Sequence, residues 1–190
     1  MGRKRRTFVA LEIPDAVKEE AGRVQARILE TGGGVRPVDP SRMHLTMKFV
    51  GDFEESRLGD LCGAVSRAAG EVAPFALRFE GVGAFPGLRK PRVVYLRCQS
   101  EPPEAIGRLH AALEEALDGV GIRREGRTFR PHVTLARVRG RPGGGLSGSI
   151  ERMAGLSFGE GSAEELVVFL SELTPQGPVY TRAGGGRLGG

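Results

Sequence analysis

The sequence predicts an α+β fold with a largely antiparallel sheet, built from two similar halves. Segments that alternate like strands are interleaved with segments of helical periodicity. Many links between the expected strands have hairpin length, which argues against a purely parallel sheet. The same four-residue pattern also occurs twice, 88 residues apart, which is close to half of the 190-residue chain.

The first half of the chain is expected to alternate strands and helices. Residues 7–13 are rich in β-branched and apolar residues and predict a strand. Pro14 and Asp15 then begin a helix that ends before three consecutive glycines. The other elements expected here are strands at 35–38, 43–50 and 75–79 and a helix at 58–69.

The second half is expected to repeat this alternation. A Gly- and Pro-rich loop at 81–91 leads into strands at 93–98, 131–138, 166–173 and 179–182, with helices at 106–117 and 150–154. Residues 123–127 form a charged loop and residues 140–149 a flexible one. Residues 183–190 contain five glycines, so we expect a poorly packed, flexible tail after a single domain at 1–182.

The composition is that of a folded protein with an anionic partner. The hydrophobic fraction of 39% is ordinary, and no apolar run is long enough to cross a bilayer. With no signal-peptide pattern, the chain is expected in the cytoplasm, as a monomer. The net charge of +5 comes mainly from arginine, which suits phosphate and favours nucleic acid. Cys62 and Cys98 lack the spacing of a disulfide framework or a zinc site.

Two of the three histidines stand in the repeated pattern, His44-Leu45-Thr46-Met47 and His132-Val133-Thr134-Leu135. Side chains alternate across a strand, so each histidine shares a face with the threonine two residues later. The apolar residues between them face the core. Two such strands facing each other would place two imidazoles and two hydroxyls around one small anion.

This set of groups suits the opening of a cyclic phosphodiester. Water must lose a proton while the leaving alkoxide gains one, and histidine titrates near neutrality. The hydroxyls of Thr46 and Thr134 can donate to the phosphate oxygens as charge builds on them. This chemistry needs no metal and no cofactor, and none is expected. A buried histidine beside a threonine can also be purely structural, but the matched pair favours function.

Three nearby residues are candidates for substrate binding. Lys48 is expected on the same face as His44 and Thr46, and Arg130 lies just before the second pattern. Phe129 could stack on a base. Lys48 and Arg130 could equally be solvated charges at strand ends, and Phe129 could be a core residue. We expect Arg42 and Arg137 at the surface, and His110 to be structural.

The chain resembles the RNA 2′,3′-cyclic phosphodiesterases once called 2′–5′ RNA ligases, a family of two-histidine phosphoesterases. The resemblance covers nearly the whole chain and rests on segments at 8–14, 44–51, 83–86, 129–138 and 177–180. Two features depart from the family: Pro37 stands where an aromatic residue is common, and residues 183–190 replace a last apolar strand.

The resemblance implies two lobes, each an antiparallel sheet with helices outside, facing a central cleft. It implies hydrolysis of RNA 2′,3′-cyclic phosphate ends to 2′-phosphates, with His44 as proton donor and His132 as proton acceptor. It also implies reversible 2′–5′ joining of tRNA halves as a side activity. Two alternatives stay open: an RNA-end binding protein without turnover, and a phosphodiesterase acting on a small cyclic nucleotide.

Overall fold

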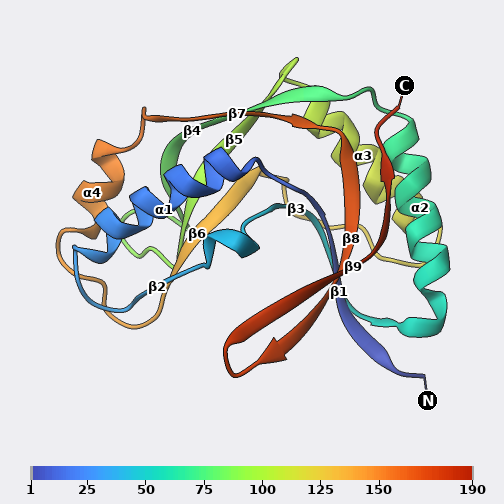
Figure 1. The fold of residues 1–190 in the computed structure, drawn as a ribbon, viewed down its shortest axis with the longest axis horizontal. Coiled ribbons are helices and arrows are strands. Elements are labelled where there is room, and N and C mark those ends of the chain that lie inside the picture. Colours follow the sequence, from blue (N-terminus) through green and yellow to red (C-terminus); the bar gives the residue numbers. More distant parts are fainter. Residues whose placement is uncertain (1, 190) are drawn as a thin grey trace.

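The protein has the α+β fold that the sequence predicts. The structure, a computed structural model that describes residues 2–189, pairs nine strands in antiparallel fashion in the order β7-β4-β5-β6-β3-β1-β8-β9, with β2 beside β6 (Figure 1). Within this range, no helix is both long and apolar enough to span a membrane.

Two lobes divide the sheet between them (Figure 1). The first contains β3 (Leu45–Glu54), β1 (Lys4–Leu11), β8 (Glu165–Thr174) and β9 (Gly177–Arg187), with helices α2 (Leu58–Gly70) and α3 (Ala105–Asp118). The second contains β2 (Val35–Pro37), β6 (His132–Val138), β5 (Val93–Glu101), β4 (Phe75–Phe85) and β7 (Ser157–Ala163), with α1 (Asp15–Leu29) and α4 (Leu146–Arg152). Short 3₁₀ turns lie at Pro40–Arg42 and Glu55–Arg57.

The two lobes join at one point of the sheet. Strands β3 and β6 pair only at Leu45 and Val133, and they diverge on either side of this pair. The two sheets expected from the resemblance are therefore two halves of one sheet, because this single pair connects them.

The internal duplication is visible in the order of the elements. The series β1, α1, β3, α2, β4 is followed by β5, α3, β6, α4, β8, and each member of the second series begins 87 to 90 residues after its counterpart. The strands mirror each other about the junction, as β4-β5-β6 on one side and β8-β1-β3 on the other. The junction is therefore the centre of a pseudo-two-fold arrangement.

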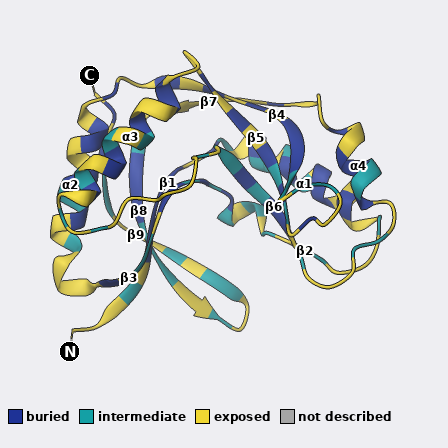
Figure 2. Cartoon of the chain, turned by 180° about the vertical axis from the view of Figure 1, so that it is seen from behind, coloured by how far each residue is buried: buried dark blue, intermediate teal, exposed yellow. Residues whose placement is uncertain are grey.

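The predicted core faces are confirmed in the helices. The buried side chains of α1 include Val17, Ala21, Val24 and Ile28, which follow the helical spacing read from the sequence. The yellow outer faces of the helices and the blue inner strands of Figure 2 show the same division.

Several element boundaries differ from the prediction. Strand β4 runs to Phe85, into the segment expected as a loop, and α4 begins at Leu146 within the expected flexible loop. Strand β7 is absent from the sequence prediction, because its sequence, SFGEGSA, is short and mostly polar or glycine. It forms an edge strand that pairs only with β4, and an edge strand does not need two apolar faces.

The prediction of a poorly packed tail is wrong for residues 183–188, and Gly190 lies outside the described residues. Strand β9 continues to Arg187 along β8, and Leu188 is buried. The glycines allow helix α2 to approach β9 closely: a Cβ at Gly184 would lie 2.6 Å from Sγ of Cys62, and one at Gly186 would overlap the backbone of Ser66. Glycine is here a packing residue, and the domain extends through the last described residues.

We expect Gly186→Ala to destabilise the fold by about 1–3 kcal/mol, because the added methyl group must push α2 away from β9. The matched control is Gly59→Ala in α2, where a Cβ meets no atom within 4 Å. Urea unfolding of both variants measures the difference. Equal stability of the two variants would contradict the packing role of Gly186.

Candidate active site

The two histidines lie at the junction of the lobes. Leu45 stands directly opposite Val133, so the register places His44 across from Thr134 and His132 across from Thr46. All four side chains project from the same face, because they alternate with the buried pair. The pairing of β3 with β6 thus places the two patterns opposite each other, as the sequence predicts.

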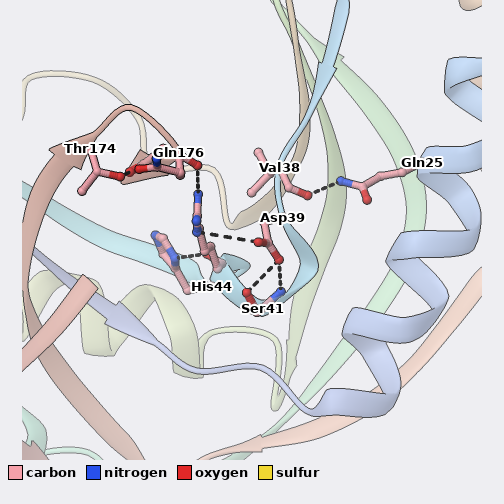
Figure 3. A network of polar contacts seen from close by, with 9 residues as sticks. Gln25, Val38, Asp39, Ser41, His44, Thr174 and Gln176 are labelled. Carbon is pink, nitrogen blue, oxygen red and sulfur yellow. Dashed lines mark hydrogen bonds and ion pairs between the residues drawn. The ribbon is translucent and has the colours of Figure 1, made fainter. Parts of the chain in front are cut away.

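Both imidazoles are held in the same way. Nδ1 of His44 lies 2.8 Å from the carbonyl oxygen of Arg42, and Nδ1 of His132 lies 2.7 Å from that of Arg130. A carbonyl can only accept, so each Nδ1 carries the proton and donates it. Figure 3 shows this anchor at His44. In both residues Nε2 remains available for chemistry.

Each imidazole packs against one phenylalanine and one tyrosine. His44 stacks on Phe8 with ring centroids 4.7 Å apart and meets the edge of Tyr180 at 5.4 Å. His132 meets Phe85 at 5.1 Å and Tyr95 at 5.4 Å, both in edge-to-face geometry. The aromatic rings limit the movement of the imidazoles and exclude water from one side of each.

This packing affects the protonation of both imidazoles. Burial lowers the pKa of His44 below its usual value of 6.5, and the nearby His132 lowers it further, against the opposing effect of the Arg42 carbonyl. Burial also lowers the pKa of His132, helped by Arg137 and opposed by the Arg130 carbonyl. The strand register, which puts both rings on one face of the sheet beside the Leu45–Val133 pair, accounts for the effect of His132 on His44.

Two β-bulges add residues that the sequence did not reveal. In β3, Thr46 pairs with Ala10 and Lys48 with Val9, so the residue between Thr46 and Lys48 has no partner in β1. Strand β6 has the same irregularity against β5, at the residue that follows Thr134. Each bulge brings the fifth residue after the histidine back to the site face. These residues are Phe49, whose side chain is 58% exposed, and Arg137.

Arg137 is exposed, as the sequence predicted, and the bulge places it on the same face as His132. Its charge acts on His132 and on Tyr180, which belong to opposite lobes. A sequence signal did exist: Leu135 and Ala136 are two consecutive buried apolar residues, which strict alternation does not allow.

Lys48 does not line the site, so its predicted substrate-binding role is wrong. The bulge turns its side chain to the opposite face of the sheet, where the residue is only 2% exposed. Its Nζ donates to Oε1 of Glu114 at 2.6 Å and to the carbonyl of Arg123 at 2.9 Å, while Oε2 of Glu114 accepts the backbone N–H of Glu125 at 2.9 Å. This buried cluster ties β3 and α3 to the loop that leads to His132.

Phe129 differs from its predicted role, whereas the substrate-binding role of the Arg130 side chain stays a prediction. Phe129 stacks on His110 of α3, with ring centroids 4.0 Å apart and planes at 8°, so it supports the loop and is not a free platform for a base. Arg130 contributes its main-chain carbonyl to the anchor of His132, and its side chain is exposed. The expectation that His110 is structural agrees with this stacking.

Other cations surround the site. Burial raises the pKa of Tyr180, and the charges of Arg137, Arg42 and Arg6 act in the opposite direction. The guanidinium of Arg42 is itself held between Asp39, at 3.8 Å, and the carbonyl of Gln176, at 3.3 Å (Figure 3). In residues 2–189, no three His, Cys, Asp or Glu side chains form a cluster that could hold a metal ion.

A sequence model of the 2′-5′ RNA ligase superfamily matches residues 5–143, which include both histidine patterns. The chain belongs to this superfamily. The resemblance found in the sequence is thereby confirmed.

Relatives of this superfamily member match most of its length. It is 33% identical over 177 residues to an RNA 2′,3′-cyclic phosphodiesterase of Archaeoglobus fulgidus, covering 92% of this chain and 96% of the relative. It is 34% identical over 180 residues to an RNA 2′,3′-cyclic phosphodiesterase of Thermus thermophilus, covering 93% and 86%.

Solved structures show the same fold. The crystal structure of the Thermus thermophilus protein TT0787 superposes with a TM-score of 0.79 at 32% identity, covering 97% of this chain and 98% of that one. The structure of E. coli LigT complexed with 3′-AMP superposes with a TM-score of 0.73 at 25% identity, covering 98% and 99%.

The buried cluster of this superfamily member generates a stability prediction. Lys48→Met leaves the Glu114 carboxylate buried without its cation, so we expect a loss of about 3–5 kcal/mol in the free energy of unfolding. Lys48→Met combined with Glu114→Gln should recover part of this loss, because the second change removes the unpaired charge. Guanidinium unfolding of the two single variants and the double variant measures the coupling.

The control for this cycle is Arg78→Gln, which removes an exposed arginine near Glu101 and Glu160 and should cost less than about 1 kcal/mol. Strictly additive effects of Lys48→Met and Glu114→Gln would show that the ion pair does not stabilise the loop.

Proposed function

We propose that the protein is an RNA 2′,3′-cyclic phosphodiesterase that hydrolyses the cyclic end to a 2′-phosphate by acid and base catalysis from two histidines. The observation that supports this most strongly is the position of His44 and His132 on either side of the Leu45–Val133 pair, each with Nδ1 anchored on a backbone carbonyl. The RNA 2′,3′-cyclic phosphodiesterases among its relatives support the substrate class.

The proposed reaction is a displacement at phosphorus. Nε2 of His132 accepts a proton from water as the water oxygen bonds to phosphorus. The bond from phosphorus to the 3′-oxygen breaks, and Nε2–H of the protonated His44 gives that oxygen its proton. One water is consumed, and the products are a 2′-phosphate and a free 3′-hydroxyl. The histidines end in exchanged protonation states, which solvent resets.

The other groups of the site stabilise charge. The hydroxyls of Thr46 and Thr134 stand across from the opposite histidines and can donate to the two non-bridging oxygens. Arg137 adds positive charge on the His132 side. Because the two imidazoles supply both proton transfers, the proposal requires no metal ion. The same displacement with the 5′-hydroxyl of a second RNA in place of water would form a 2′–5′ phosphodiester and release the 3′-hydroxyl, and this joining of tRNA halves stays a prediction.

His44→Ala and His132→Ala should each lower kcat on an RNA oligonucleotide with a 2′,3′-cyclic phosphate end by about 10²–10⁴-fold, because each removes one proton transfer. Thr46→Val or Thr134→Val should cost about 10²-fold. Product analysis by chromatography measures turnover in the presence of a chelator. The control is Arg78→Gln, which removes an exposed arginine outside the site.

The outcomes separate the three candidate functions. Substantial turnover by both active-site histidine variants would refute the mechanism. Tight RNA binding by the wild type without product would favour the RNA-end binding protein. Turnover restricted to nucleoside 2′,3′-cyclic phosphates would favour the small-nucleotide enzyme.

The assignment of donor and acceptor can be tested with a leaving group that needs no proton. A nucleotide 4-nitrophenyl phosphodiester releases a stable phenolate, so on this substrate His44→Ala should lose far less activity than His132→Ala. The opposite ranking would exchange the two roles.

The lowered pKa values predict the pH dependence. The base must be neutral, so kcat/KM rises as the pH increases through the pKa of the base. The acid must be protonated, so kcat/KM falls as the pH increases through the pKa of the acid. Both values are lowered from 6.5, so the bell-shaped profile should have its maximum below pH 6.5. A maximum well above neutrality would show that the substrate-free site does not favour neutral imidazoles.

A further inference from the structure

We infer that a basic surface at one end of the second lobe, outside the histidine site, binds the backbone of the RNA several nucleotides away from its cyclic end. This surface, called the basic end, consists of five exposed side chains: Arg89, Lys90, Arg92, Arg139 and Arg141. The inference rests on the proposed function and adds to it a preference for long RNA substrates over short ones.

The basic end combines the two longest segments of the chain that contain no acidic residue. Residues 81–100 contain four arginines and lysines, residues 126–150 contain five arginines, and neither segment contains Asp or Glu. The two segments lie side by side, because strand β5 of the first pairs with strand β6 of the second. The sheet therefore gathers on one lobe positive charge that the sequence holds in two separate places.

The loops that carry the cations are in direct contact. The backbone N–H of Val138 donates to the carbonyl of Arg92 at 2.9 Å, and Oγ of Ser147 donates to the carbonyl of Leu88 at 2.7 Å. The loop at 86–92, between β4 and β5, therefore lies against the segment that follows β6. The cations of the two loops form one surface.

Apolar residues anchor the loop at 86–92 and leave its cations exposed. Pro91 is buried, and Leu88 packs against the hydrophobic core. Arg89 and Lys90 lie between these two anchors and are both exposed. An anion that binds to an anchored loop pays less for ordering it, so the loop is suited to binding.

The same loop begins at the active site. Phe85 meets the ring of His132 at 5.1 Å, and its carbonyl accepts the N–H of Arg92 at 2.7 Å. At the rise of a strand, about 3.3 Å per residue, Arg139 lies roughly 20 Å along β6 from His132. Successive nucleotides of one strand in a nucleic-acid helix lie about 3.4 Å apart along the axis, so this separation corresponds to about six nucleotides.

The protein does not neutralise the basic end. In residues 2–189, none of its five members makes an ion pair. By contrast, Arg78 on β4 of the same lobe lies near both Glu101 and Glu160. The unpaired arginines present planar forks of donors, which suit phosphate.

The distance from the histidines indicates the kind of anion. A small cyclic nucleotide has a single phosphate, which the histidines hold, and it cannot also reach a surface roughly 20 Å away. A polynucleotide can contact both places at once. Contacts to phosphates do not read bases, so the basic end should act on RNA of any sequence.

The test compares a dinucleotide with a twelve-nucleotide RNA that ends in the same cyclic cytidine. For the wild type at low salt, kcat/KM should favour the longer RNA. In the double variant Arg89→Gln, Lys90→Gln, the ratio of kcat/KM for the long RNA to that for the dinucleotide should fall about tenfold, because two phosphate contacts are lost. The slope of log kcat/KM for the long RNA against log salt concentration should become shallower by about 1.4, or about 0.7 for each cation removed.

The matched control is the double variant Arg67→Gln, Arg108→Gln, which removes two exposed cations from helices α2 and α3 of the first lobe. It should leave the ratio unchanged, and a fall as large as that of the test variant would show that only net charge matters. Equal losses on both substrates with Arg89→Gln, Lys90→Gln, or no loss on either, would also overturn the basic end, while turnover of the dinucleotide would still support the proposed function.

An equilibrium measurement separates the failure of the surface from the failure of the proposed function. If the wild type turns over neither substrate, the proposed function is refuted, and fluorescence anisotropy with the twelve-nucleotide RNA tests the basic end alone. Arg89→Gln, Lys90→Gln should then bind this RNA about tenfold more weakly than the control variant does. Equal affinity of the two variants would overturn the basic end.

Discussion

The single pairing of Leu45 with Val133 is the contact on which the site depends. Each of these residues stands between the histidine and the threonine of its pattern, and each is fully buried. Their alignment fixes which threonine faces which histidine, since a shift of one residue would turn all four polar side chains to the other face. Because no other residues of β3 and β6 pair, this one contact joins the two halves of the sheet.

The two bulges determine which further side chains lie on the face of the histidines. A regular strand would have placed Lys48 beside Thr46, as strict alternation suggests. The extra residue instead sends Lys48 into the interior and brings Phe49 to the open face. The same device on β6 presents Arg137. The two halves therefore have the same backbone arrangement, and the fifth residue after each histidine makes the two sides of the site chemically different.

The buried cluster around Lys48 and Glu114 links the two patterns through the interior. Lys48 lies on the strand of the first pattern, and the loop it contacts at Arg123 leads to the second. The ring of Phe129 on His110 adds a second support to that loop. A buried ion pair is costly to desolvate and tolerates little displacement, so it fixes the loop in one position. The anchor of His132 at the Arg130 carbonyl depends on the same loop.

The sequence by itself determined much of this protein: the α+β class, the duplication, the helices and most strands, and the four residues His44, Thr46, His132 and Thr134. These depend on local periodicity and on a repeated pattern, both of which are properties of neighbouring residues. The tertiary structure alone decided the orientation of Lys48 and Phe49, because a bulge is defined by the pairing of a partner strand. It also decided that the glycines at 184–186 belong to a strand. A glycine-rich segment is flexible in isolation, and here it is ordered because the absence of side chains lets a helix pack closely against it.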